Sequence, residues 1–345
     1  MTSHMTGDRS RFEPGTLGAA TLRSKRPAGR SLALGRAQRA VGRQIWLFAA
    51  IAILVTGGGV AYDLAGGVRV LSSLAFWAPI GLGLGLLAGL VRELNRNTVT
   101  VLSNLGKHRG YTVLGAAPQL TERALRELAP DKRSPFGCVA FQPASPFATA
   151  FRDLQGVLRE DQLVAFIASS PAEGATTAAL CTAVAAAQQG RRVIVVDCDT
   201  RRRSLTKELG SNPTAGILEC CEEPQNWRSY IEEEPETGIH LLPAARMTNP
   251  WKTLVASNNL SVLLGFLREH YDLIVLDCPP ALRTGEGSIL ASYADKAVAV
   301  AAWDQTQINA IRQTVKTLQN RAGVRTAVYV NRVLPGFRFG RLRPD

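Results

Sequence analysis

The pattern of apolar and polar positions divides the chain into a membrane-like part and an α/β part. Two uncharged apolar runs occupy residues 45–62 and 70–91. Because a helix needs about 20 such residues to cross a bilayer, we expect a transmembrane hairpin over residues 45–91. A pair of buried core helices is the alternative. A signal peptide is disfavoured, since it would start nearer residue 1 and would not need the second run.

Beyond residue 146, apolar runs rich in β-formers alternate with helical stretches. Predicted strands cover 163–168, 193–197, 239–242, 272–277, 296–302 and 325–330. Predicted helices lie near 175–189, 251–269, 286–293 and 306–321. Strands that are apolar throughout and alternate with helices are typical of a parallel sheet covered on both faces. The predicted fold is therefore α/β, a mostly parallel doubly wound sheet preceded by the two-helix transmembrane hairpin.

Charge separates the same two parts. The chain has 345 residues and a net charge of +12. Residues 1–145 carry 18 Lys/Arg against 7 Asp/Glu, whereas residues 146–345 carry 22 against 21. The basic character therefore does not belong to the α/β part, so we expect no nucleic-acid partner. Because positive flanks stay in the cytoplasm, we expect a membrane protein with both termini and the α/β domain cytoplasmic.

These patterns give five predicted segments. They are a basic disordered tail over 1–44, the hairpin over 45–91, a junction over 92–145, the α/β domain over 146–334 and a second basic tail over 335–345. The six cysteines form no CxxC pair, so we expect reduced thiols and no zinc site of that spacing.

Three clusters of candidate functional residues follow predicted strands. The stretch LVAFIASSPAEGATT over 163–177 is a strand, a small-residue loop and a helix start, as in a phosphate-binding loop. Its lysine position holds Ala175, while Thr176 keeps a hydroxyl for Mg²⁺. Asp197 ends the strand at 193–197 and Asp199 follows it, while Asp277 ends the strand at 272–277. Ligands in such sheets bind beyond the carboxyl ends of the strands, so these carboxylates could hold Mg²⁺ or act as a base.

Together the three clusters resemble the bacterial tyrosine kinases (BY-kinases) and polysaccharide co-polymerases of exopolysaccharide biosynthesis, which are related to the MinD/ParA ATPases. The family patterns SxxPGEGKT, DxDxRRPSL and YDxVIIDTPP resemble residues 170–176, 197–205 and 271–280. The resemblance extends over roughly 70–334 and implies a P-loop NTPase fold.

The resemblance also assigns site residues. It implies a catalytic or metal-binding role for Asp197, Asp199 and Asp277, with Mg²⁺ held near Thr176, Asp197 and Asp277. It places the nucleotide against the loop and puts Asn331 near the base. The loop residues concerned are Ala172, Glu173, Gly174, Ala175, Thr176 and Thr177. ATP or ADP with Mg²⁺, or no nucleotide at all, remain alternatives.

This sequence departs from the family at several positions. Ala172 replaces a loop glycine and Ala175 replaces the loop lysine, which degrades the Walker A motif. The family's ExxRxxR helix motif for subunit contact corresponds to Thr149, Arg152 and Gln155, so only the first arginine is kept. No tyrosine follows Tyr329, so the family's C-terminal tyrosine cluster is absent. The large periplasmic domain expected between the two apolar runs is missing as well.

The departures concern one reaction, phosphoryl transfer, which needs charge neutralisation at the outer phosphates. We therefore expect a pseudokinase that acts as a membrane-anchored regulator or scaffold of exopolysaccharide biosynthesis and export. Its expected partners are the inner membrane, polymerase or export proteins, and an active BY-kinase or a second copy of the chain. The alternatives are an active tyrosine kinase or ATPase that uses an atypical loop, and a MinD/ParA-like positioning ATPase.

Overall fold

The computed structural model separates the chain into two compact units, Met1–Arg96 and Asn97–Asp345. It describes residues 49–67, 70–94, 98–99, 111–246, 254–257 and 259–334. The basic tails predicted over 1–44 and 335–345 lie outside the described residues.

The first unit contains two helices that pack against each other. One covers residues 49–65 and the other, α2, covers Val70–Leu94. The indole Nε1 of Trp77 donates a hydrogen bond to Asp63 at 2.9 Å. A Cβ at Gly59 would lie 2.2 Å from the Trp77 ring, so only glycine allows this close approach.

The helical character predicted for residues 45–91 is confirmed where the structure describes them. In that described part of the chain, no helix combines the length and the apolar character that crossing a membrane requires. The prediction of membrane-crossing helices is thus not confirmed.

The second unit is built on an eight-stranded sheet of order β1-β8-β7-β2-β6-β3-β5-β4. Neighbouring strands are parallel except β4, which pairs antiparallel with β5. The strands are β1 (Thr112–Pro118), β2 (Leu163–Ala168), β3 (Val193–Asp197), β4 (Glu232–Glu233), β5 (His240–Leu242), β6 (Leu273–Asp277), β7 (Lys296–Ala302) and β8 (Arg325–Val333). The mostly parallel α/β fold and its six predicted strands are confirmed.

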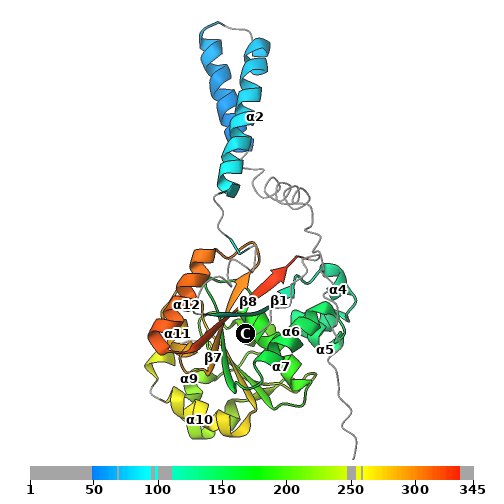
Figure 1. Ribbon diagram of the computed structural model, residues 1–345, viewed down its shortest axis with the longest axis vertical. Helices are drawn as coiled ribbons and strands as arrows, with labels where there is room; N and C mark the ends of the chain where they lie inside the picture. The colour runs from blue at the N-terminus through cyan, green and yellow to red at the C-terminus, as the bar shows by residue number, and fades with distance from the viewer. Residues whose placement is uncertain are drawn as a thin grey trace, which may run out of the picture. The chain divides into compact units, whose positions relative to one another are not determined.

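Helices cover both faces of this sheet (Figure 1). The apolar core of one face includes side chains of α5 (Pro135–Phe141), α6 (Pro146–Val157) and α7 (Ala175–Ala187). The core of the other face includes side chains of α10 (Leu260–His270), α11 (Glu286–Ala291) and α12 (Ile308–Ala322). The short elements are α4 (Glu122–Arg126), η1 (Pro130–Lys132), α8 (Ser204–Glu208), α9 (Ile217–Cys220), η2 (Pro224–Tyr230) and η3 (Leu254–Ala256).

The sequence prediction treats residues 92–145 as a junction, but the structure gives part of this segment to the α/β unit. Strand β1 joins the sheet beside β8, and α5 packs into the core of one face. All six cysteines are free and buried, in agreement with the expected reduced thiols.

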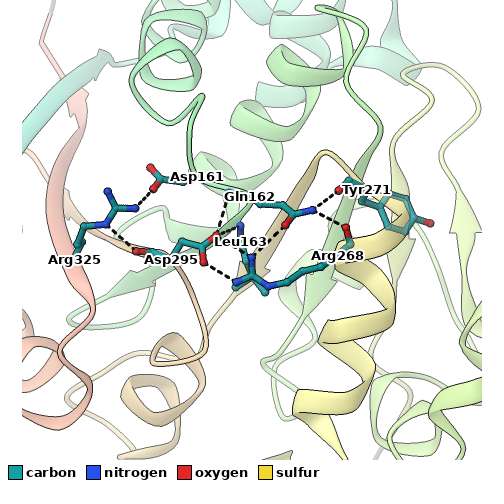
Figure 2. A network of polar contacts seen from close by, with 7 residues as sticks. All are labelled: Asp161, Gln162, Leu163, Arg268, Tyr271, Asp295 and Arg325. Atoms are coloured by element: carbon teal, nitrogen blue, oxygen red, sulfur yellow. Dashed lines mark hydrogen bonds and ion pairs between the residues drawn. The ribbon is translucent and has the colours of Figure 1, made fainter.

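A polar network fixes the amino ends of the central strands (Figure 2). The Asp295 carboxylate, just before β7, accepts hydrogen bonds from the backbone N–H groups of Gln162 and Leu163 and pairs with Arg268. The Gln162 amide donates to the carbonyl oxygens of Arg268 and Tyr271. These bonds tie the start of β2 to α10 and β7, so the opposite, carboxyl ends of the strands are held in register.

Two ion pairs extend the network. The Asp161 side chain is 1% exposed, and its carboxylate lies 2.6 Å from Lys296 Nζ and 2.5 Å from Arg325 Nη2.

Burial alone would raise the pKa of Asp295, but the hydrogen bonds from Arg268 and the two backbone N–H groups outweigh the effect of burial. The pKa of Asp295 is therefore lowered.

Candidate functional site

The carboxyl ends of three central strands bring the predicted site residues together. In the sheet register Asp197 on β3 pairs with Asp277 on β6, and Asp277 pairs with Phe166 on β2. The loop that leaves β2 therefore lies beside both carboxylates. A cavity of about 270 Å³ opens here. Its lining includes Ala172, Glu173, Gly174, Ala175, Thr176, Thr177, Asp199, Arg202, Asp277, Cys278 and Arg332.

The loop between β2 and α7 turns through two residues with positive φ. Gly174 has φ +97° and Ala172 has φ +65°, so both residues adopt the left-handed region. A Cβ at Gly174 would lie 2.2 Å from the side-chain nitrogen of Asn331, so this position requires glycine for space as well as for conformation. Asn331 is 3% exposed and does not line the cavity among the described residues. The structure thus places Asn331 against the loop backbone.

Glu173 folds back onto its own loop. Its carboxylate Oε2 accepts hydrogen bonds from the N–H groups of Ser169 at 2.9 Å and Ser170 at 3.0 Å. Burial raises the pKa of Glu173, and these bonds oppose the rise. The side chain therefore acts as an internal anion that holds the first half of the loop in place.

The start of α7 remains available to a ligand. Gly174 precedes this helix without any side-chain cap. The first N–H groups of a helix have no partner within the helix and carry the positive end of its dipole. Ala175, Thr176 and Thr177 form this first turn and line the cavity. The geometry suits an anion such as a phosphate group, although Ala175 supplies no charge.

The three predicted carboxylates lie together, and their hydrogen bonds do not offset the rise in pKa that burial causes. Asp277 accepts a hydrogen bond from the Thr176 hydroxyl at 2.8 Å. Burial, and then the nearby Asp197 charge, raise the pKa of Asp277 well above its usual value. Asp197 is held by the N–H and hydroxyl of Thr206 at 2.9 and 2.7 Å, yet burial raises its pKa to about 6. Burial also raises the pKa of Asp199.

Raised carboxyl pKa values of this kind favour a cationic ligand, since a bound divalent ion would stabilise the charged forms. Thr176 and Asp277 face the cavity and are the residues that would hold Mg²⁺ on a nucleotide. Asp197 is fully buried and is not among the described lining residues. Within the described residues, no group of three or more His, Cys, Asp or Glu side chains could hold a metal by itself.

Two arginines at the cavity matter because the loop lysine is missing. Arg202, from the segment after β3, and Arg332, in β8, both line the cavity. Arg201 instead pairs with Glu286 at 3.4 Å, and Arg203 is buried with its Nε bonded to the Ala244 carbonyl. Sequence reasoning missed Arg332. The one signal for it is that it directly follows Asn331.

Comparisons with known proteins agree with this geometry. The model of a family described as "AAA domain" matches residues 162–326. "Putative tyrosine-protein kinase EpsB" of Ralstonia nicotianae is 24% identical over 291 residues, covering 80% of this chain and 39% of that protein. "Succinoglycan biosynthesis transport protein ExoP" of Rhizobium meliloti is 24% identical, covering 81% of this chain and 39% of its own length. The chain thus spans about two fifths of the length of these curated relatives.

Solved structures share the fold. The kinase domain of the Escherichia coli tyrosine kinase ETK superposes with a TM-score of 0.61 at 20% identity, covering 71% of this chain and 97% of that one. The BceF tyrosine kinase domain gives 0.59 at 22% identity, covering 68% and 99%. The chain thus shares the fold of BY-kinase domains, and its motifs and curated relatives make it similar to the BY-kinases of exopolysaccharide biosynthesis, with Ala172 and Ala175 departing from the Walker A loop.

Proposed function

We propose that the chain is a regulatory or scaffold protein of exopolysaccharide biosynthesis and export whose kinase-like domain has lost phosphoryl transfer. The observation that carries the proposal is Ala175 in the first turn of α7, at the cavity, where the family has its lysine. Removing one well-placed electrostatic donor typically costs about 2.7–4 kcal/mol of transition-state stabilisation, or roughly 100- to 1000-fold in rate.

The acceptor side of the reaction is also affected. No tyrosine follows Tyr329, and Tyr329 itself is 1% exposed in β8. A buried tyrosine cannot reach a neighbouring active site without unfolding. Among the described tyrosines of the α/β unit, Tyr293 is the most exposed, at 37%. The missing loop charge at Ala175 and the burial of Tyr329 therefore point to the same lost reaction.

A pseudokinase of this kind would still bind ligands and partners. ATP or ADP would lie against the α7 N-terminus, with Mg²⁺ at Thr176 and Asp277. The expected partners are polymerase or export proteins, together with an active BY-kinase or a second copy of the chain. The similarity to ExoP, a succinoglycan biosynthesis transport protein, supports a role in polymer export.

Exposed apolar side chains on the helical pair support attachment to the inner membrane. Ile53, Leu54 and Phe76 are 71%, 76% and 62% exposed. Large apolar side chains exposed together on one unit are typical of a membrane or protein interaction site. A cytoplasmic α/β unit is proposed from the positive flanks of the two apolar runs.

Genetic complementation tests the scaffold role. Deleting the gene should change the amount or length of the exported polymer, and the full chain should restore both. The Asp277→Asn variant should restore them equally, because the proposed role needs no phosphoryl transfer. Normal polymer in the deletion strain, or failure of a folded Asp277→Asn variant to complement, would contradict the proposal.

One observation favours the alternative of an active kinase or ATPase with an atypical loop. Arg202 and Arg332 bring positive charge to the cavity from outside the loop. If either guanidinium neutralised the outer phosphates during transfer, catalysis would survive without a loop lysine. Turnover measurements separate the two functions.

A further inference from the structure

We propose that Arg332 replaces the missing loop lysine as the residue that grips the phosphates of a nucleoside diphosphate or triphosphate, with Arg202 as a second contact. This inference rests on nucleotide binding within the proposed function and names the residues that carry it. It assigns the chain a polyphosphate site with its own charge arrangement, built from the end of β8 and the segment after β3.

The backbone around Arg332 places its side chain at the cavity. Asn331 packs against Gly174 of the loop, which brings the end of β8 directly beside the first turn of α7. Arg332 then adopts φ +60°, a left-handed conformation that residues other than glycine rarely take. Its N–H donates to the side-chain oxygen of Asn331 at 2.8 Å, which stabilises this turn. Strained backbone of this kind is found at ligand-binding positions.

The guanidinium of Arg332 keeps its charge available. Its Nη1 donates to the neutral amide oxygen of Gln305 at 3.3 Å. In the part of the chain that the structure describes, no salt bridge joins a carboxylate to Arg332 or to Arg202. The backbone N–H of Arg202 donates to Asp199 at 3.0 Å, which fixes the segment that carries the side chain.

The combined features select a polyphosphate. An uncapped helix N-terminus offers N–H donors to one phosphate, and two guanidinium groups offer planar, bidentate donors to others. A cavity of about 270 Å³ with hydroxyls at Thr176 and Thr177 completes the set. Arginine presents a rigid fork where lysine presents a compact charge. The arrangement therefore favours stable binding of a polyphosphate chain over stabilisation of a phosphoryl group while it is being transferred.

Calorimetric titration of the purified full chain tests this inference. Mg²⁺-ADP and inorganic pyrophosphate are the two probes, and their comparison separates nucleotide recognition from simple anion capture. We expect wild type to bind Mg²⁺-ADP more tightly than pyrophosphate, and Arg332→Ala to weaken ADP binding at least 10-fold. Arg283→Ala is the matched control, since Arg283 is exposed and lies three residues beyond cavity-lining Pro280 without lining the cavity itself. It should bind as wild type.

A charge-rescue variant distinguishes a ligand contact from a structural role. Adding Ala175→Lys to Arg332→Ala should restore most of the lost ADP affinity, because the charge returns to the same cavity from the family's position. Restoration supports the replacement of lysine by Arg332. Absence of restoration, unchanged affinity in Arg332→Ala, or no binding of either probe by wild type would overturn it. Each of these failures leaves the scaffold role standing, because genetic complementation measures that role separately.

Discussion

Replacing Asp197 by asparagine tests the prediction that the acidic edge of the site destabilises the free protein near neutral pH. Asp197 is fully buried beside Asp199 and Asp277, and burial raises its pKa to about 6 from the usual 3.8. An acid whose pKa is raised on folding binds its proton more tightly in the folded state. Its contribution to stability is therefore fully present below pH 3.8 and is lost as pH rises through about 6.

The raised pKa sets the size of the effect. A rise of about two pKa units corresponds to roughly 3 kcal/mol of lost stability between the fully protonated and the fully ionised protein. About half of that loss falls between pH 5 and pH 8. The Asp197→Asn variant loses the titration but keeps an acceptor for the two hydrogen bonds from Thr206. The free energy of unfolding of wild type relative to the variant should thus fall by about 1–2 kcal/mol over this range.

Urea unfolding of both proteins at pH 5, 6, 7 and 8, without Mg²⁺, measures this difference. Asp295→Asn serves as a control at the other end of the sheet, and its stability relative to wild type should stay constant between pH 5 and 8. Because the pKa of Asp295 is lowered, its stabilisation is present above the unfolded value and is lost as pH falls towards the folded one. A wild-type stability that stays constant or rises relative to Asp197→Asn between pH 5 and 8 would refute the reasoning.

Two further substitutions test parts of the fold that support the site. Asp161→Asn should cost about 3 kcal/mol of unfolding free energy in urea, because Lys296, with a 15% exposed side chain, loses its partner at 2.6 Å; a loss below about 1 kcal/mol would show that the pair is dispensable. Ala172→Gly should raise the free energy of unfolding by about 0.5–1 kcal/mol. Glycine removes the backbone strain of an alanine at φ +65°, and this gain exceeds the cost of the greater conformational entropy of the unfolded chain. A lower melting temperature of the Ala172→Gly variant would contradict the claim that the backbone of Ala172 is strained.

The sequence predicted the central strands because they are buried on both sides and therefore apolar throughout. Strands β2, β3, β6 and β7 have almost every side chain buried, so continuous apolar runs identify them. The edge strands lack that signal. β1 is partly exposed and contains Gly115, and β4 consists of the exposed pair Glu232 and Glu233. Sheet pairing, which no local pattern encodes, makes these segments strands.

The same distinction applies to the site. Asp197, Asp277 and the loop follow strands directly, so chain position alone predicted their meeting at one edge. Arg332 reaches the cavity through the packing of Asn331 on Gly174 and through a left-handed backbone. The capping of the loop by the Glu173 carboxylate likewise depends on burial. These features arise from tertiary contacts between distant segments, which spacing along the chain cannot reveal.

Phosphoryl transfer by the purified full chain tests the central claim most directly. Incubation with Mg²⁺-ATP, followed by measurement of released phosphate and of phosphotyrosine, should show no turnover above that of the Asp277→Asn variant. This result is expected because Ala175 leaves the outer phosphates without the loop charge. Turnover in wild type that disappears in Asp277→Asn would contradict the account and establish an active enzyme with an atypical loop.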